Sequence, residues 1–163
     1  MRGLCFRLET MAKEGYTPML MYGPPEKSFE RKKCVVAAVL RDGASVLATQ
    51  RGYGEWKGWW EFPGGKVQQG ETYEEALARE MREEMDADIV VERLLTTVRY
   101  SYPDFDLEMY CYLCELVDGK YTLKEHIDAR WLTAETIHTV RWLPADEELI
   151  DHLYEMIDST SRN

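Results

Sequence analysis

The sequence predicts a mixed α/β (α+β) fold built as a single domain. Strand-like apolar runs come first and return in the second half of the chain, while helical patterns follow Thr72 and Pro144. A chain of 163 residues that is 45% hydrophobic and 31% charged has the size and composition of one globular domain. The order strands, helix, strands, helix therefore indicates sheet and helix layers around a common core.

Strands are predicted where β-branched and aromatic residues gather. We expect them at residues 34–40, 45–51, 59–62, 87–102, 105–117 and 129–132. Asp42-Gly43 is a hairpin turn signal after the first strand, and Asp118-Gly119 predicts a second hairpin turn. Pro63-Gly64-Gly65 predicts a sharp break in the chain.

Two helices are predicted from capping and periodicity. Thr72 and Glu75 form a T-x-x-E capping box, and a helical period continues from there to Met85. Pro144 opens a last helix whose apolar residues fall on one face, namely Leu149, Leu153 and Ile157. Residues 34–158 form the expected domain, preceded by an extension over residues 1–33 and followed by a fraying tail over residues 159–163.

The charge balance excludes several classes of partner. Thirty acidic and twenty basic residues give a formal net charge of −10, whereas proteins that grip a nucleic-acid backbone show the opposite balance. No apolar run approaches the roughly 20 residues of a membrane span, and the first residues lack the apolar stretch of a secretory signal. We therefore expect a cytoplasmic protein without a nucleic-acid or membrane partner.

Cys111 and Cys114 form a C-x-x-C sequence inside a predicted strand. Positions three apart in a strand face opposite ways, and no second cysteine pair exists to complete a zinc site. The spacing therefore predicts two packed thiols rather than a redox or metal pair.

The first predicted helix carries a cluster of acids beside its apolar face. At 100° per residue, Glu80, Glu83 and Glu84 fall within about 100° of arc, next to the stripe that contains Leu77 and Met81. A solvated surface is the ordinary interpretation of such a run. Carboxylates at these spacings repel each other, however, and the repulsion grows as solvent is lost. Together with the upstream Gly-Gly-Lys turn, they indicate a site for Mg²⁺ or Mn²⁺ that bridges to phosphate.

Residues 65–87 resemble the Nudix box, G-x5-E-x7-R-E-U-x-E-E-x-G-U, where U is apolar. The matching positions are Gly65, Glu71, Arg79, Glu80, Met81, Glu83, Glu84 and Ala87. The one departure is Asp86, where the family has a glycine that ends the helix in a left-handed conformation. Asp tolerates that conformation better than most residues, so we expect a small stability cost and intact chemistry.

The resemblance covers roughly residues 34–155, since Lys124-Glu125 and the lead-in to the box, Trp60-Glu61-Phe62-Pro63-Gly64-Gly65-Lys66, also look like the MutT-like nucleotide hydrolases. It implies a Nudix fold, with a mixed β-sheet sandwiched between helices. It also implies Mg²⁺-dependent hydrolysis of nucleoside triphosphates to the monophosphate and pyrophosphate, in sanitation of the nucleotide pool. Hydrolysis of another nucleoside diphosphate derivative such as ADP-ribose, and a non-catalytic nucleotide-binding or regulatory module, are the alternatives. The nucleotide is the expected partner, and the protein is expected to be a monomer or a homodimer.

The resemblance implies a role for each matched residue. The implied metal ligands are the Gly64 carbonyl, Glu80, Glu83, Glu84 and Glu125. Glu80 or Glu125 is the candidate base, with Glu80 favoured, while Arg79 orients the glutamates and Glu71 supports the loop.

The implied substrate-binding residues are Arg51, Phe62, Gly65, Lys66 and Asp146. Arg51 and Lys66 are candidates for phosphate contacts, and a solvated lysine is the alternative for Lys66. Phe62 is expected to line the base pocket. Asp146 stands where MutT-like members have a base-reading asparagine, and its alternative is an acid interacting with the helix dipole. As an ionised acceptor, it suits 8-oxoguanine or the cytosine amino group, so both 8-oxo-dGTP and CTP or modified dCTP stay open as substrates.

Overall fold

The computed structural model describes residues 31–160, with side chains through Tyr154. The first helix and strands are β1 (Lys32–Asp42), β2 (Ser45–Arg51), β3 (Trp60–Glu61), β4 (Gly64–Lys66) and α1 (Tyr73–Met85). They are followed by β5 (Ile89–Ser101), β6 (Asp106–Leu116), β7 (His126–Leu132), a 3₁₀ turn η1 (Ile137–Thr139) and α2 (Pro144–Thr160). This order confirms the predicted alternation of strands and helices.

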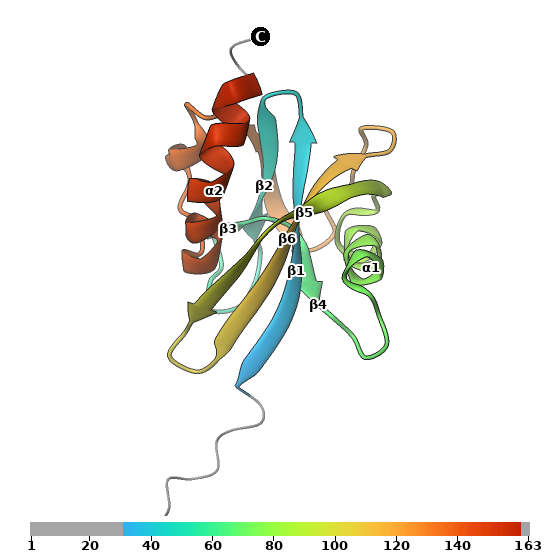
Figure 1. Cartoon of the computed structure of the whole chain (residues 1–163), viewed down its shortest axis with the longest axis vertical. Helices are drawn as coiled ribbons and strands as arrows, with labels where there is room; N and C mark the ends of the chain where they lie inside the picture. The colour runs from blue at the N-terminus through green and yellow to red at the C-terminus, as the bar shows by residue number, and fades with distance from the viewer. Residues whose placement is uncertain (1–30, 161–163) are drawn as a thin grey trace, which may run out of the picture.

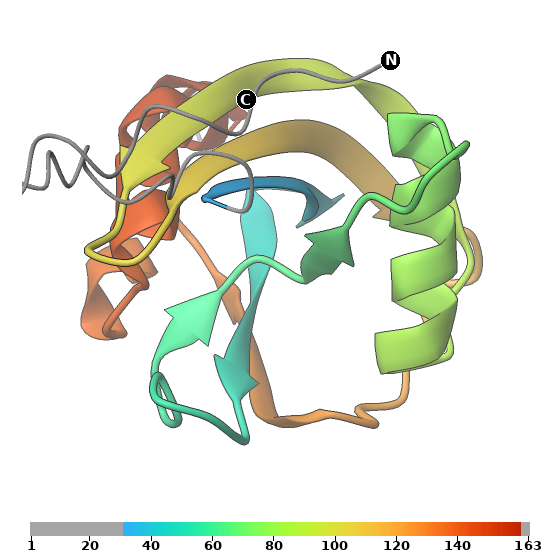
Figure 2. The ribbon, with the colours of Figure 1, turned by 90° about the horizontal axis from the view of Figure 1, so that it is seen from below.

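The seven strands form one mixed sheet that lies between the two helices. The main path runs β3-β2-β1-β6-β5, with β4 paired to β1 and β7 paired to β2. Strands β1 and β6 are parallel, and the other pairs are antiparallel. Helix α1 covers one side of this layer and α2 the other, as the two views in Figures 1 and 2 show. The expected mixed sheet between helices is confirmed.

The structure differs from the predictions at Asp118-Gly119, expected to form a hairpin turn, and after Pro63, where a break in the chain was expected. The Asp42-Gly43 hairpin is present, with Asp42 opposite Ser45. Asp118-Gly119 does turn, since the Lys120 N–H donates to Asp118 Oδ1 at 3.0 Å, but it makes no hairpin because β7 pairs with β2 instead of β6. After Pro63 the chain does not leave the sheet, because β4 adds to β1 with Gly64 opposite Ala37.

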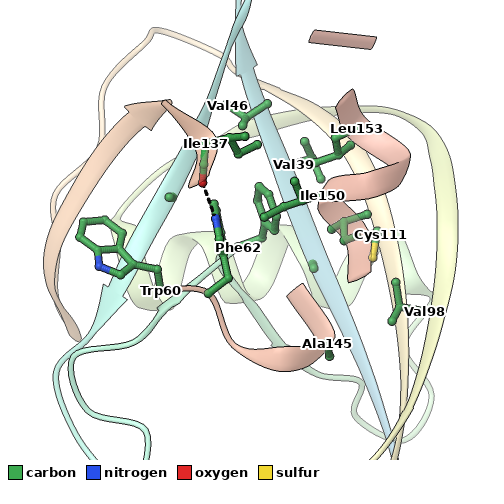
Figure 3. Packing of buried hydrophobic residues seen from close by; sticks show 14 of the residues in the cluster. Val39, Val46, Trp60, Phe62, Val98, Cys111, Ile137, Ala145, Ile150 and Leu153 are labelled. Carbon is green, nitrogen blue, oxygen red and sulfur yellow. Dashed lines mark hydrogen bonds between the residues drawn. The ribbon is translucent and has the colours of Figure 1, made fainter. Parts of the chain in front are cut away.

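The buried side chains form two clusters on opposite faces of the β1–β6 layer. One lies under α2 and contains Cys111, and the other lies under α1 and contains Cys114. Both cysteines are buried free thiols whose pKa burial raises to about 12. Figure 3 shows the α2 cluster, in which Phe62 lies near Ile150 at the centre and Trp60 lies apart at the left of the view. The expectation of separate packed thiols is confirmed.

Helix α1 begins and ends as its sequence predicts. The Thr72 side chain accepts from the Glu75 N–H and the Glu75 carboxylate accepts from the Thr72 N–H, which completes the capping box. At the other end Asp86 adopts the left-handed conformation with φ 47°. Asp86 therefore fills the cap position that the Nudix pattern gives to glycine, at the cost of a conformation that glycine adopts more easily.

Some expectations fall where the structure gives no description. The extension over residues 1–33 lies outside the described residues except for 31–33, of which 32 and 33 already belong to β1. Residues 161–163 of the expected tail and the side chain of Ile157 also lie outside them. Neither helix in residues 31–160 is long and apolar enough to cross a membrane.

Candidate active site

Two adjacent glycines bring β4 close to both the sheet and α1. A Cβ on Gly64 would meet the backbone carbonyl of Val36 on β1. A Cβ on Gly65 would stand 2.5 Å from both carboxylate oxygens of Glu80 on α1. Glycine is therefore needed at Gly64 for packing against β1, while at Gly65 it leaves room for the Glu80 carboxylate, which lies directly against the β4 backbone.

Arg79 ties the acidic face of α1 to the loop before it. Its guanidinium donates to both oxygens of Glu71 and, at 2.9 Å, to the Lys66 carbonyl. The same group donates to Glu80 at 2.7 Å and to Glu83 at 3.2 Å. Glu71 also accepts from the Gln68 N–H at 2.9 Å, which supports the loop as expected. Hydrogen bonds to these carboxylates raise the pKa of Arg79, so it stays charged and holds the glutamates in place.

Glu84 is the buried member of the acidic cluster. It is only 9% exposed, and its Oε2 is a buried oxygen without a hydrogen-bond partner among the described residues. Burial, followed by the negative charges of Glu61, Glu80 and Glu125, raises the pKa of Glu84 to about 8. A buried carboxylate surrounded by others is costly unless a cation compensates it.

The loop that carries Glu125 docks on the C-terminal end of α1. The Thr122 N–H donates to the Met85 carbonyl at 2.7 Å, and the Lys124 N–H donates to the Glu84 carbonyl at 3.0 Å. These bonds satisfy carbonyls that a helix end leaves free. They place Glu125 one residue from an anchor on the metal-candidate helix, so the helix and the loop contribute to the same region.

A cleft of about 840 Å³ brings the sequence-predicted site residues together. All eleven of them line it: Arg51, Phe62, Gly64, Gly65, Lys66, Arg79, Glu80, Glu83, Glu84, Glu125 and Asp146. The lining carries seven acidic and four basic side chains. Because acidic side chains predominate in the lining, a phosphate chain can bind in the cleft only if a cation lies between it and the carboxylates.

A second part of the cleft lining is aromatic, and its Phe62 belongs to the buried cluster under α2. Phe62 is 3% exposed and stacks on Trp142, with ring centroids 4.7 Å apart. The Phe62 N–H donates to Asp146 Oδ1 at 2.8 Å, and Tyr102 and Phe105 line the cleft nearby. Burial raises the pKa of Asp146 well above its usual value. The expected ionised acceptor is therefore held in an environment that favours the neutral carboxyl, which donates as well as accepts.

The sequence analysis gave no role to Glu61, which lines the cleft, or to the buried His126, which contacts Glu61. Glu61 belongs to the lead-in that carried the resemblance, and it lines the cleft. Its carboxylate contacts Arg51 Nη1 at 2.7 Å and His126 Nε2 at 3.1 Å. Arg51 is thus paired with an acid rather than standing free. The sequence signal that could have indicated His126 is its position directly after the candidate ligand Glu125.

The carboxylates of the cleft are of the ligand type that hard divalent cations bind. Carboxylate and carbonyl oxygens are the ligands that Mg²⁺ and Mn²⁺ prefer, and the unpartnered Glu84 Oε2 offers one in a buried position. As the side chains stand, no group of three His, Cys, Asp or Glu within residues 31–154 is close enough to hold a metal ion. Glu80 and Glu83 are instead engaged by Arg79.

Comparisons with known proteins agree with this geometry. Residues 31–153 match the NUDIX domain family. The 8-oxo-dGTP diphosphatase of Escherichia coli is 32% identical over 93 residues, which cover 57% of this chain and 72% of the relative. The CTP pyrophosphohydrolase of E. coli is 30% identical over 118 residues, which cover 72% of this chain and 87% of the relative.

A solved structure extends the comparison to the fold. The DNA mismatch repair protein MutT of methicillin-resistant Staphylococcus aureus 252, described as a Nudix hydrolase, is 32% identical with a TM-score of 0.63. The match covers 78% of this chain and 99% of that one. Nudix hydrolases act on nucleotide substrates and use divalent metal ions. With its box, its sheet between two helices and its acid-lined cleft, this chain belongs to the Nudix hydrolase family as a MutT-like pyrophosphohydrolase.

Proposed function

We propose that this enzyme hydrolyses an oxidised or modified nucleoside triphosphate to the monophosphate and pyrophosphate, with Mg²⁺ as the metal and Mn²⁺ as a substitute. 8-Oxo-dGTP is the first candidate substrate, and CTP or modified dCTP is the second. The names of the two E. coli relatives, 8-oxo-dGTP diphosphatase and CTP pyrophosphohydrolase, support these two candidate substrates.

The observation that carries the proposal is the division of one cleft into two chemical ends. Glu80, Glu83 and Glu84 line the cleft from α1, and Glu125 lines it from the loop docked on that helix, while Phe62 lines it from the cluster under α2. A nucleotide has the same division, with a charged phosphate chain at one end and a flat base at the other. The cleft therefore matches a substrate whose phosphates need a cation and whose base needs an apolar wall.

At the acidic end we assign a separate role to each residue in metal binding and proton transfer. The Gly64 carbonyl, Glu80, Glu83, Glu84 and Glu125 would hold the metal, and Arg79 keeps two of these carboxylates oriented. A bound divalent cation supplies charge neutralisation at phosphate oxygens and lowers the pKa of water. Glu80 is our candidate for the base that takes the water's proton, with Glu125 as the alternative. Arg51 and Lys66 line the cleft as candidate phosphate contacts.

The base end is compatible with both candidate substrates. 8-Oxoguanine presents the N7–H donor beside the O6 acceptor, and cytosine presents its amino group beside N3. A neutral Asp146 carboxyl has one O–H donor and more than one acceptor lone pair, so it complements either edge even with Oδ1 bonded to the Phe62 N–H. Asp146 Oδ1 already accepts from the Phe62 N–H, which fixes the carboxyl beside the aromatic wall.

A panel of nucleotides tests the proposal. 8-Oxo-dGTP, CTP, 5-methyl-dCTP, dATP and ADP-ribose are incubated with Mg²⁺, and ³¹P NMR distinguishes pyrophosphate from orthophosphate. We expect pyrophosphate from one of the first three, and turnover of ADP-ribose alone would overturn the proposal.

A pair of glutamate variants tests the metal assignment in the same assay. Glu83→Gln should abolish Mg²⁺-dependent turnover, because a neutral amide binds the cation poorly. Glu74→Gln is the matched control on the same helix, since Glu74 is exposed and does not line the cleft. Wild-type activity in Glu83→Gln would refute the role of that carboxylate.

A further inference from the structure

We infer that Glu61 binds a sugar hydroxyl of the nucleotide, and that Arg51 and His126 hold its carboxylate in position for that contact. This inference rests on the proposed nucleoside triphosphate substrate and adds a third subsite between the metal end and the base end of the cleft. Glu61 lines the cleft but belongs to neither end as described above.

Direct contacts place Glu61 between the two ends. On one side, its Oε1 lies 3.1 Å from Nε2 of His126, the residue that directly follows the candidate metal ligand Glu125. On the other side, the next residue, Phe62, donates its N–H to Asp146 Oδ1 at 2.8 Å. Glu61 therefore contacts the residue next to Glu125, and its own neighbour Phe62 contacts Asp146.

The carboxylate is held by a pair of residues that face each other across two strands. Arg51 on β2 and His126 on β7 are partners in the antiparallel register of these strands. Arg51 Nη1 approaches Glu61 Oε2 at 2.7 Å, while His126 approaches Oε1. Side-chain exposure is 25% for Arg51, 17% for Glu61 and 3% for His126. The two donors therefore fix both oxygens from within the fold.

The remaining capacity of this carboxylate matches what a sugar offers. Two carboxylate oxygens accept about four hydrogen bonds in all, and the two partners use one on each oxygen. An ionised carboxylate accepts only, and the sugar hydroxyls are the donors that lie between the base and the α-phosphate of a nucleotide. A hydroxyl that reaches Glu61 gains a hydrogen bond to a charged acceptor, which is stronger than one between neutral groups.

The test compares substrates that differ only in their hydroxyls. For the base preferred in the panel above, kcat/KM is measured with the ribonucleoside, 2′-deoxy and 2′,3′-dideoxy triphosphates. In the wild-type enzyme, removal of the contacted hydroxyl should lower kcat/KM by about tenfold or more, the equivalent of one hydrogen bond to an ionised group. In Glu61→Gln the same removal should cost about threefold or less, because the acceptor is neutral.

Two further variants separate sugar recognition from general damage. Glu55→Gln is the matched control, because Glu55 is an exposed glutamate that lines the same cleft, and its discrimination between the three sugars should equal that of the wild type. His126→Gln should weaken the discrimination in the same direction as Glu61→Gln. A loss of folding alone would lower all three rates equally and leave their ratios unchanged.

The outcomes distinguish this inference from the proposed function. If the wild-type enzyme hydrolyses all three triphosphates equally well, the sugar contact is refuted while the proposed function stands. Unchanged ratios in active Glu61→Gln would refute it too. If the wild-type enzyme hydrolyses none of them, the proposed function fails and this inference falls with it.

Discussion

Replacing Gly65 with alanine adds one methyl group against the carboxylate of Glu80. The new Cβ would stand 2.5 Å from Glu80 Oε1 and Oε2, whereas ordinary contact begins at 3.4 Å. The carboxylate must therefore move by about 1 Å, and a displacement of this size in a catalytic group costs about 100-fold in rate. We expect kcat/KM of Gly65→Ala to fall by about that factor with the substrate that the panel identifies.

The same substitution should leave the fold largely intact. The atoms it meets belong to the end of a flexible side chain, which can turn away, although the turn also disturbs the bond from Arg79 to Glu80. Gly64→Ala is the informative neighbour, because its Cβ would meet the backbone carbonyl of Val36, which cannot turn away. We expect Gly64→Ala to lower the melting temperature much more than Gly65→Ala does.

Steady-state kinetics and thermal unfolding of the two variants decide the matter. The expected pattern is a stable, slow Gly65→Ala and an unstable Gly64→Ala. A Gly65→Ala enzyme with wild-type kcat/KM would show that the Glu80 carboxylate has no required position against β4. That result would refute the catalytic role we give to Glu80.

Three further predictions concern the charged groups of the cleft. Arg79→Lys should lower the free energy of unfolding by about 2 kcal/mol in chemical denaturation, because an ammonium cannot replace the forked contacts with Glu71 and Glu80; an unchanged midpoint would contradict this. Above about pH 8, where Glu84 is ionised, Glu84→Gln should raise the melting temperature of the metal-free protein, since it removes a buried charge among other carboxylates, and it should abolish turnover. Because the pKa of Asp146 is raised in the folded state, the wild type should lose stability as pH rises from about 4, the unfolded value, through the folded value. Asp146→Asn should lose less over that range, and parallel pH–stability curves would refute this.

Local signals in the sequence were sufficient to predict helix α1 and the acidic face that carries its candidate metal ligands. The capping box at Thr72 and Glu75, the left-handed cap at Asp86 and the adjacency of Glu80, Glu83 and Glu84 all depend on neighbours within a few residues. Helical geometry alone brings such residues together, so periodicity predicts them. The resemblance then linked this helix to Gly64 and Glu125.

Long-range pairing was the part that local patterns could not specify. Asp118-Gly119 has the composition of a hairpin turn, yet β7 crosses to β2, and only the tertiary arrangement decides between these partners. The raised pKa of Asp146 likewise depends on burial beneath Phe62, which lies 84 positions earlier in the chain. The Arg51, Glu61 and His126 cluster joins three strands, so no spacing within one segment indicates it.

The acids of the cleft differ in whether they have a cationic partner within the fold. Arg79 pairs with Glu71, Glu80 and Glu83, and Arg51 pairs with Glu61, so these carboxylates have cationic partners within the fold. Glu84 has none for its buried Oε2 among the described residues. Because an unpartnered buried carboxylate costs stability, its presence beside Gly64 is better explained by binding than by folding. The least stabilised acid of the helix is therefore the one on which the proposed metal site most depends.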